Sequence, residues 1–234
     1  INKSQEHHKL NLIELRMGLD AISGNVQQES SLKATITRPD SFQAIDHNDL
    51  IGAKNEVVSH IVDNLQSRGR NTSEDEVAIL LTCIMQNLIV TLAGKPGSGK
   101  SSTVSELAHV LGIQLHGKYA HLQVQRGWSS DRDLLGFYNK LSHSYDPDRF
   151  GLYKLINSLQ EVERDNQLSF ALLDEANLSP IEHYWSGFMG AFDDPSSFTT
   201  QGDRLSLPEG LRFIATVNYD RTTEPLSARF LDRS

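Results

Sequence analysis

The sequence predicts an α/β domain in which a parallel sheet is flanked by helices on both sides. Apolar runs typical of buried strands alternate along the chain with segments whose apolar residues recur at helical spacing. The first of these runs also leads directly into a glycine-rich loop and another helix. A chain of 234 residues is long enough for one large domain and a small appendage. We place the boundary near Asn48, with an N-terminal helix and linker over 1–48 and the α/β core over 49–234.

The expected helices rest on apolar periodicity and on start signals. Leu10, Ile13 and Met17 predict a first helix over 9–22, and the polar stretch up to Asp49 predicts a linker. Capping signals mark two later starts, at Ser73 with Glu76 and at Ser179 with Pro180 and Glu182. The later helices are expected over 53–67, 73–86, 151–163 and 180–192.

Strands are expected where apolar, partly β-branched residues form short continuous runs, as in a sheet that is covered on both faces. The segment from Phe198 to Pro208, with a Gly202-Asp203 turn between two extended runs, predicts a β-hairpin. An aromatic stripe at helical spacing over 181–192 predicts core packing rather than a cofactor site. The expected strands cover 88–93, 121–124, 169–173 and 211–217.

Composition excludes several classes of protein. With 22 basic and 30 acidic residues, the formal charge is −8. The chain therefore has no excess of positive charge that would indicate a nucleic acid or an anionic membrane as partner. The single cysteine, Cys83, lies among apolar residues, which predicts a reduced thiol and a cytoplasmic location. The sequence contains no stretch of eighteen apolar residues and no signal-peptide pattern, so it predicts no membrane-spanning or targeting segment. The nine histidines do not show, with cysteine partners, the spacing that is typical of zinc ligands.

The segment Gly94–Ser101 fits the pattern G-x-x-x-x-G-K-[ST] at every fixed position, between an expected buried strand and an expected helix. In such a P-loop, or Walker A motif, backbone amides and the helix N-terminus bind phosphate oxygens. Lys100 is expected to reach the β- and γ-phosphates, and Ser101 to bind Mg²⁺. The residues predicted to bind the nucleotide here are Gly94, Pro96, Gly97, Ser98, Gly99, Lys100, Ser101 and Ser102.

An apolar strand that ends in two acids, Asp174 and Glu175, predicts the other half of the site. Asp174 is expected to hold Mg²⁺ through water at the carboxyl edge of the sheet, as in a Walker B motif. Glu175 is expected to orient the attacking water or to accept its proton. Taken alone, an Asp-Glu pair after a strand fits a solvated turn better; the upstream loop makes the catalytic interpretation the stronger one.

Three segments resemble the dynein-related AAA+ ATPases, a group that includes MoxR-type chaperones, midasin and McrB-type restriction NTPases. These segments are Leu173-Asp174-Glu175-Ala176-Asn177-Leu178-Ser179-Pro180, residues 126–136, which end in Asp-Leu-Leu-Gly, and Ile214-Ala215-Thr216-Val217-Asn218. The resemblance covers about 50–234. It implies a P-loop NTPase core whose helical lid would follow Ser234, so that the chain is expected to be cut from a longer protein.

The resemblance also implies roles for individual residues. Asn218 would lie near the γ-phosphate and help Glu175 to place the water. Arg229 or Arg233 would act as an arginine finger in the site of a neighbouring subunit, with the choice between them open. Gly52 would border the base. Trp128 would either face a central pore or cap the core.

The leading hypothesis is an Mg²⁺-dependent, ring-forming NTPase, most simply a homohexamer, that remodels a protein substrate or partner subunit. ATP is the expected nucleotide, and GTP stays open because no motif reports on the base. An alternative is the motor subunit of a DNA restriction or defence complex, which would contact nucleic acid only through a partner or another domain. A third hypothesis, a nucleotide-gated scaffold without turnover, is disfavoured by Glu175, because pure binding does not need a second acid.

Overall fold

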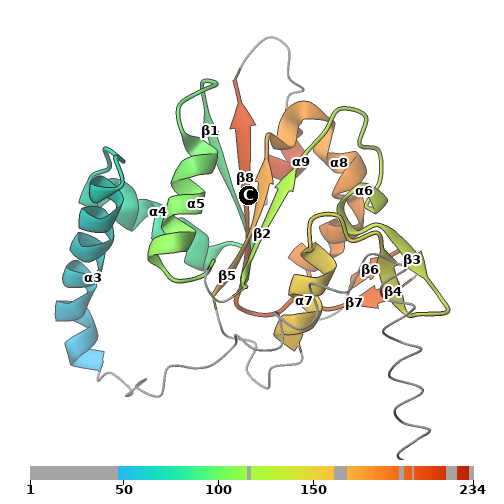
Figure 1. Cartoon of the computed structure of the whole chain (residues 1–234), viewed down its shortest axis with the longest axis horizontal. Coiled ribbons are helices and arrows are strands. Elements are labelled where there is room, and N and C mark those ends of the chain that lie inside the picture. Colours follow the sequence, from blue (N-terminus) through green and yellow to red (C-terminus); the bar gives the residue numbers. More distant parts are fainter. Residues whose placement is uncertain are drawn as a thin grey trace, which may run out of the picture. The chain divides into compact units, whose positions relative to one another are not determined.

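A four-stranded parallel sheet forms the centre of the domain, as the sequence predicts (Figure 1). The computed structural model describes residues 47–114, 117–160, 168–194, 198–201, 203–219 and 226–231. The expected helix over 9–22 lies outside them. The strand order is β1-β8-β5-β2, and the strands are β1 (Ile89–Gly94), β2 (Tyr119–Gln123), β5 (Ser169–Asp174) and β8 (Leu211–Asn218).

The registers of these strands place the polar residues at their ends along one edge of the sheet. Gly94 of β1 pairs with Asn218 of β8, and Gln123 of β2 pairs with Asp174 of β5. All neighbouring pairs are parallel. The carboxyl ends of the strands therefore meet at one edge, which is where ligands bind in open α/β sheets.

Helices cover both faces of the sheet and create two apolar cores (Figure 1). Phe170 and Leu172 of β5 face one core, while Ala171 and Leu173 face the other, as the period of two requires for a strand covered on both sides. The first core contains side chains from α3 (His47–Ser67), α4 (Glu74–Gln86) and α5 (Lys100–Val110). The second contains side chains from α6 (Arg132–Leu135), α7 (Leu152–Gln160), α8 (Ile181–Tyr184), η2 (Ser186–Phe192) and α9 (Ala228–Leu231).

Sequence signals locate most helix starts. The Ser73 hydroxyl accepts from the amide of Glu76, whose carboxylate accepts from the amide of Ser73, so the expected capping box is present at α4. By contrast, α3 begins at His47, six residues before the expected start at 53. No helix in the described part of the chain is long and apolar enough to cross a membrane.

The prediction of one continuous helix over 180–192 is wrong. The α-helix ends at Tyr184, and a 3₁₀ segment, η2, continues to Phe192. Two glycines, Gly187 and Gly190, disfavour an α-helix here, and Gly187 lies so close to its neighbours that a Cβ would be 2.7 Å from Thr200 Oγ1 and 2.8 Å from Asp131 Oδ2. The expected core stripe is nevertheless present, with Trp185 and Phe188 fully buried.

Ser179 is not the expected N-cap, since Pro180 occupies that position without a side-chain hydrogen bond. The Ser179 hydroxyl instead accepts from the amides of Gly127 and Trp128 and donates to the carbonyl of Gln125. It therefore fastens the loop after β2 to the start of α8.

Two short hairpins project from this framework (Figure 1). The expected one consists of β6 (Phe198–Thr200) and β7 (Asp203–Leu205), paired antiparallel. The other, β3 (Phe137–Asn139) with β4 (Ser144–Asp146), was not expected. Its connection, residues 140–143, contains no glycine and so lacks the turn signal that marked the other hairpin.

Candidate active site

The glycine-rich loop lies between β1 and α5, as the sequence predicts, and its backbone depends on two glycines. Gly97 and Gly99 have φ values of 75° and 83°, a backbone conformation that residues with a Cβ disfavour. Gly99 is the N-cap of α5 and provides no side-chain cap. The first amides of α5 are therefore not capped by that residue, and they can bind an anion at the positive end of the helix. Ser102 is part of this first turn, and its hydroxyl donates to the Gly99 carbonyl at 2.9 Å.

Lys100 connects this loop to the sheet. Its ammonium donates to the carbonyls of Lys95 and Gly94 at 2.9 and 3.2 Å, and to Asn218 Oδ1 at 2.8 Å. Asn218 lies 118 positions along the chain from Lys100, so the contact depends on the pairing of β1 with β8. The lysine is thereby held at the carboxyl edge of the sheet, beside the glycine-rich loop.

Asp174 is surrounded by hydrogen-bond donors from three elements. The Ser101 hydroxyl donates to its Oδ1, as does Thr216 Oγ1 at 2.7 Å, while His121 Nε2 lies 3.1 Å from Oδ2. Burial raises the pKa of Asp174, but hydrogen bonds from Ser101, Thr216 and His121 outweigh that effect and lower the pKa below its ordinary value. Asp174 is therefore ionised at neutral pH, in direct contact with the Ser101 hydroxyl.

Glu175 is held in an unusual backbone conformation. Its φ and ψ of 55° and 46° lie in the left-handed region, which costs a non-glycine residue on the order of 1–3 kcal/mol. The amide of Glu175 donates to Thr216 Oγ1 at 2.9 Å, and its Oε1 accepts from Asn218 Nδ2 at 3.1 Å. These bonds stabilise the turn and hold the carboxylate beside Asn218.

The Asn218 amide joins the two halves of the site. Its oxygen accepts from the Lys100 ammonium and its nitrogen donates to the Glu175 carboxylate. Ammonium can only donate and carboxylate can only accept, so these neighbours fix the orientation of the amide. The result is a chain of polar contacts from the glycine-rich loop to Glu175.

Asn177, which we did not single out from the sequence, fixes Asn218 in place. Its side-chain nitrogen donates to the Asn218 carbonyl at 2.9 Å, and its oxygen accepts from the Asn218 amide at 3.2 Å. Asn177 is only 3% exposed. The paired bonds make it a positioning residue for Asn218.

We expect Asn177→Ala to lower the free energy of unfolding by about 2–3 kcal/mol, because two hydrogen bonds to half-buried backbone groups are lost. Denaturant unfolding measures this change. Asn177→Asp retains an acceptor for the Asn218 amide, but it loses the donor and places a buried carboxylate against the Asn218 carbonyl, so its loss is expected to be at least as large. Equal stability of Asn177→Ala and wild type would contradict the role.

The contacts of Thr216 and His121 with Asp174 were also not predicted, although Thr216 could have been recognised from the sequence. Thr216 is a buried polar residue in the otherwise apolar run Phe213–Val217, two positions before Asn218 and therefore on the same side of β8. His121 shows no comparable sequence feature. Its proximity to Asp174 depends on the pairing of β2 with β5.

The remaining predicted residues are placed only in part. Gly52 lies in α3, and Arg229 lies in α9. Arg233 falls outside the described residues. The contacts between Lys100, Ser101, Asp174, Glu175 and Asn218 are thus what the structure adds to the predicted site.

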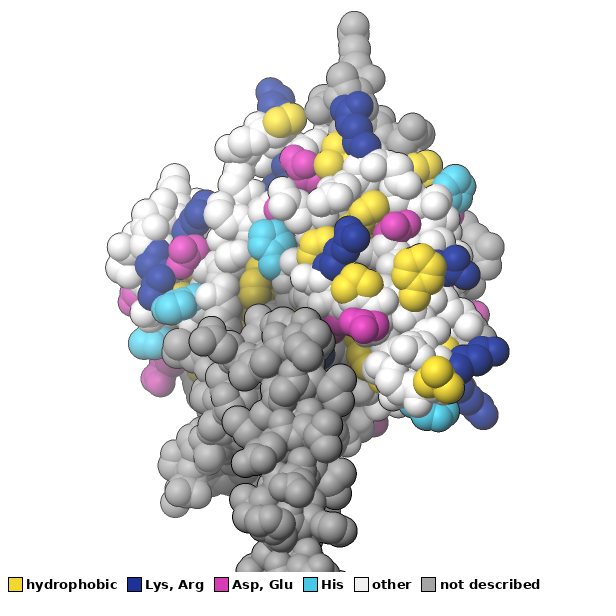
Figure 2. Space-filling view, turned by 45° about the vertical axis from the view of Figure 1, so that its right-hand side comes forward, with side chains coloured by type: hydrophobic (Ala, Val, Ile, Leu, Met, Phe, Trp, Pro, Cys, Tyr) yellow, Lys and Arg dark blue, Asp and Glu magenta, His cyan; other side chains and the backbone are white. Residues whose placement is uncertain are grey.

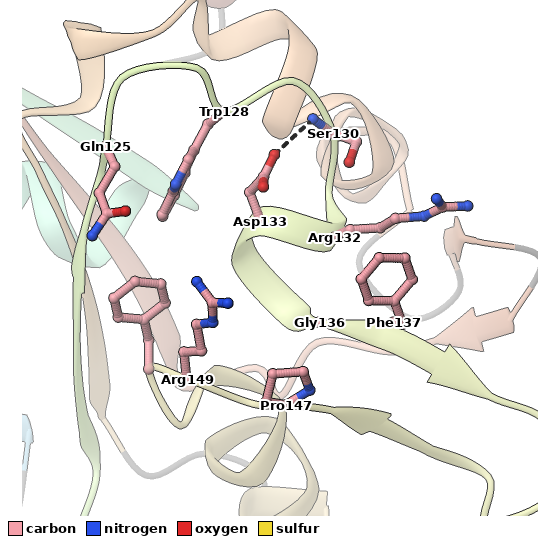
Figure 3. Close-up of a pocket in the computed structure, with 10 residues that line it drawn as sticks. Gln125, Trp128, Ser130, Arg132, Asp133, Gly136, Phe137, Pro147 and Arg149 are labelled. Carbon is pink, nitrogen blue, oxygen red and sulfur yellow. Dashed lines mark hydrogen bonds between the residues drawn. The ribbon is translucent and has the colours of Figure 1, made fainter.

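A separate cavity adjoins the loop after β2 (Figure 3). Trp128 forms part of its wall, and only 7% of this residue is exposed because it packs on Tyr184 and Phe150. Of the two interpretations of Trp128, the structure therefore supports the core cap. Figure 2 shows apolar, basic, acidic and histidine side chains intermixed on the face that it presents. The cavity is lined by Gln125, Trp128, Ser130, Arg132, Asp133, Gly136, Phe137, Pro147, Arg149 and Phe150.

Comparison with known proteins agrees with this architecture. No family model matches the sequence. The Pachytene checkpoint protein 2 homolog of Arabidopsis thaliana is 27% identical over 154 residues, which cover 63% of this chain and 30% of that protein. The crystal structure of a "putative ATPase" from Cytophaga hutchinsonii matches with a TM-score of 0.51 at 20% identity, covering 79% of this chain and 52% of the other. The structural likeness shows the fold, a parallel sheet flanked by helices that this chain shares with that protein, and the chain spans about half the length of that structure and less than a third of the Arabidopsis protein.

Proposed function

We propose that this protein is an Mg²⁺-dependent ATPase of the dynein-related AAA+ group, which assembles into a ring and uses hydrolysis to remodel a protein partner. One observation carries the proposal: Ser101 contacts Asp174 while Lys100, Asn218 and Glu175 form a continuous polar chain beside the same loop. A phosphate-binding loop, a metal-binding pair and a candidate base thus converge at one edge of the sheet.

The donor set suits Mg²⁺. A hydroxyl and an ionised carboxylate supply the oxygen ligands that this ion prefers. The described residues contain no cluster of three or more His, Cys, Asp or Glu side chains that could bind a metal alone, which suits an ion that shares the phosphate oxygens of the nucleotide. When bound, Mg²⁺ would neutralise charge on the β- and γ-phosphates.

The chain's own residues would then divide the reaction between them. The loop amides and Lys100 would bind and orient the triphosphate. Glu175 would accept a proton from the attacking water, and the Asn218 amide would hold that carboxylate in place. Arg229 or Arg233 would complete the site of a neighbouring subunit, where a guanidinium stabilises charge on the transferred phosphoryl group.

Chelation of Mg²⁺ tests the proposal on the full-length protein. We expect ATP turnover to fall to the buffer level in excess EDTA and to return on addition of Mg²⁺, because Ser101 and Asp174 provide too few ligands to retain the ion by themselves. Particle mass, measured with and without Mg²⁺-nucleotide, is expected to report assembly into a ring.

Three results would redirect the proposal. Turnover that is unaffected by EDTA would contradict the metal site. A preference for GTP together with stimulation by DNA would favour the restriction-type motor. Binding of nucleotide without turnover above the buffer level would favour a nucleotide-gated scaffold.

A further inference from the structure

Arg70, in the connection between α3 and α4, lies against the glycine at the end of the phosphate-binding loop. Its Nη1 is 2.9 Å from the point that a Cβ on Gly99 would occupy, and Ser102 Oγ is 3.6 Å from the same point. The arginine thus reaches the start of α5 from a connection that precedes the loop by almost thirty positions.

The backbone at the end of α3 fixes the position of Arg70. Gly69 has a φ of 82°, and the amide of Arg70 donates to the carbonyl of Leu65 at 3.0 Å. This is the six-to-one bond of a Schellman motif, which ends a helix in one defined direction. Leu65 is almost fully buried, so the turn that holds Arg70 is anchored in the core.

A second arginine from the same turn shows what is different about Arg70. Arg68 pairs with Glu106 of α5 at 3.0 Å. Glu106, Ser102 and Gly99 follow one face of that helix at three- and four-residue spacing. Arg68 therefore meets a carboxylate on this face, whereas Arg70 meets its N-terminal end. Among the described residues, no hydrogen bond or ion pair joins the Arg70 guanidinium to an acid.

This placement favours an anionic ligand. The N-terminus of a helix has partial positive charge, so a guanidinium there is repelled unless an anion lies between them. The carbonyl of Gly99 already accepts from the hydroxyls of Ser102 and Thr103. Arg70 is consequently not needed to satisfy that carbonyl.

We propose that Arg70 is a nucleotide-binding residue that contacts the α- and β-phosphate end of the ligand, an inference that rests on the proposed function. Lys100, Asn218 and Glu175, which would act at the γ-phosphate, gather at the carboxyl ends of β8 and β5. Arg70 approaches instead from the side of α3 and α4, since α3 packs against both α4 and α5 (Figure 1). It would therefore bind the part of the ligand that diphosphates and triphosphates share.

The test compares nucleotides that differ only at the γ-phosphate. Calorimetry on the full-length protein with Mg²⁺ measures the affinity for ADP and for the non-hydrolysable triphosphate AMP-PNP. We expect Arg70→Gln to weaken both by the same factor, roughly tenfold or more, as for a lost charge-assisted hydrogen bond. KM for ATP is expected to rise by that factor while kcat stays unchanged, because the residue would bind ground state and transition state equally.

Two variants serve as controls. Arg68→Gln removes an arginine of the same turn together with its pairing to Glu106, and it is expected to leave both affinities unchanged. Arg70→Lys keeps the charge but loses the planar guanidinium, so it is expected to recover part of the affinity. Thermal unfolding without nucleotide is expected to be the same for Arg70→Gln and wild type.

Several results would overturn the assignment. Wild-type affinity of Arg70→Gln for both nucleotides would show that the arginine does not bind the ligand. A loss of affinity for AMP-PNP alone would place the residue at the γ-phosphate. Unfolding at a clearly lower temperature, with no recovery of affinity in Arg70→Lys, would make the arginine structural. If wild type binds neither nucleotide, the proposed function itself fails, and this is seen before any variant is made.

Discussion

Replacing Glu175 by glutamine is expected to lower the kcat for ATP in the assembled, full-length protein by roughly 10²–10⁴-fold, the usual contribution of a general base. Glutamine cannot accept the proton of the attacking water. Its carbonyl oxygen can still accept from Asn218 Nδ2, so the contact seen at 3.1 Å is expected to persist. The nucleotide affinity is therefore expected to change little.

Phosphate release under saturating ATP measures the first effect, and ADP calorimetry measures the second. Glu182→Gln is a suitable control, since Glu182 lies on the neighbouring helix α8 and accepts from the amide of Ser227. It is expected to hydrolyse ATP at the wild-type rate. Normal turnover by Glu175→Gln would show that another group handles the proton, and the catalytic assignment would be wrong.

The strand, glycine-rich loop and helix over 89–110 could be predicted almost completely, because their determinants are contiguous. Glycines, lysine and serine at fixed spacing specify a local backbone shape, and the flanking strand and helix can be recognised from their periodicity. The pair Asp174-Glu175 could be found for a similar reason, at the end of an apolar strand. That these two segments meet is a consequence of strand order, with β8 lying between β1 and β5.

The residues that support the site could not be predicted in this way. Asn177 acts through Asn218, 41 positions away, and His121 reaches Asp174 across 53 positions. Each contact depends on which strands pair and in what register, information that no single segment contains. Arg70 is a further example, because its position beside Gly99 follows from the direction in which α3 ends.

The segment 180–192, predicted as one helix, shows that apolar periodicity alone does not determine the type of helix. Its apolar residues do repeat at helical spacing, and they do form the core. Gly187, however, must pass close to Thr200 and Asp131, and glycine is a weak helix former. Close packing against the hairpin therefore prevails over the α-helical period, and the chain winds into a 3₁₀ segment.

The second large effect is expected at Lys100. Lys100→Ala removes the ammonium that would bind the β- and γ-phosphates, and a charge-assisted hydrogen bond contributes about 1.5–3 kcal/mol, or roughly 10- to 150-fold in affinity. The Asn218 amide also loses its donor at 2.8 Å, so Glu175 is expected to be held less firmly. Both affinity and kcat are therefore expected to fall.

The pattern across nucleotides separates this lysine from Arg70. Because Lys100 would reach the γ-phosphate, Lys100→Ala is expected to weaken AMP-PNP more than ADP, whereas Arg70→Gln would weaken both equally. Lys95→Ala is the control within the same loop, since Lys95 is exposed and Lys100 contacts only its backbone carbonyl. Calorimetry with the two nucleotides measures the loss of affinity for AMP-PNP relative to the loss for ADP. An equal loss for ADP and AMP-PNP in Lys100→Ala would mean that the ammonium acts at the β-phosphate and not at the γ-phosphate, and the assignment of Lys100 to the γ-phosphate would be wrong.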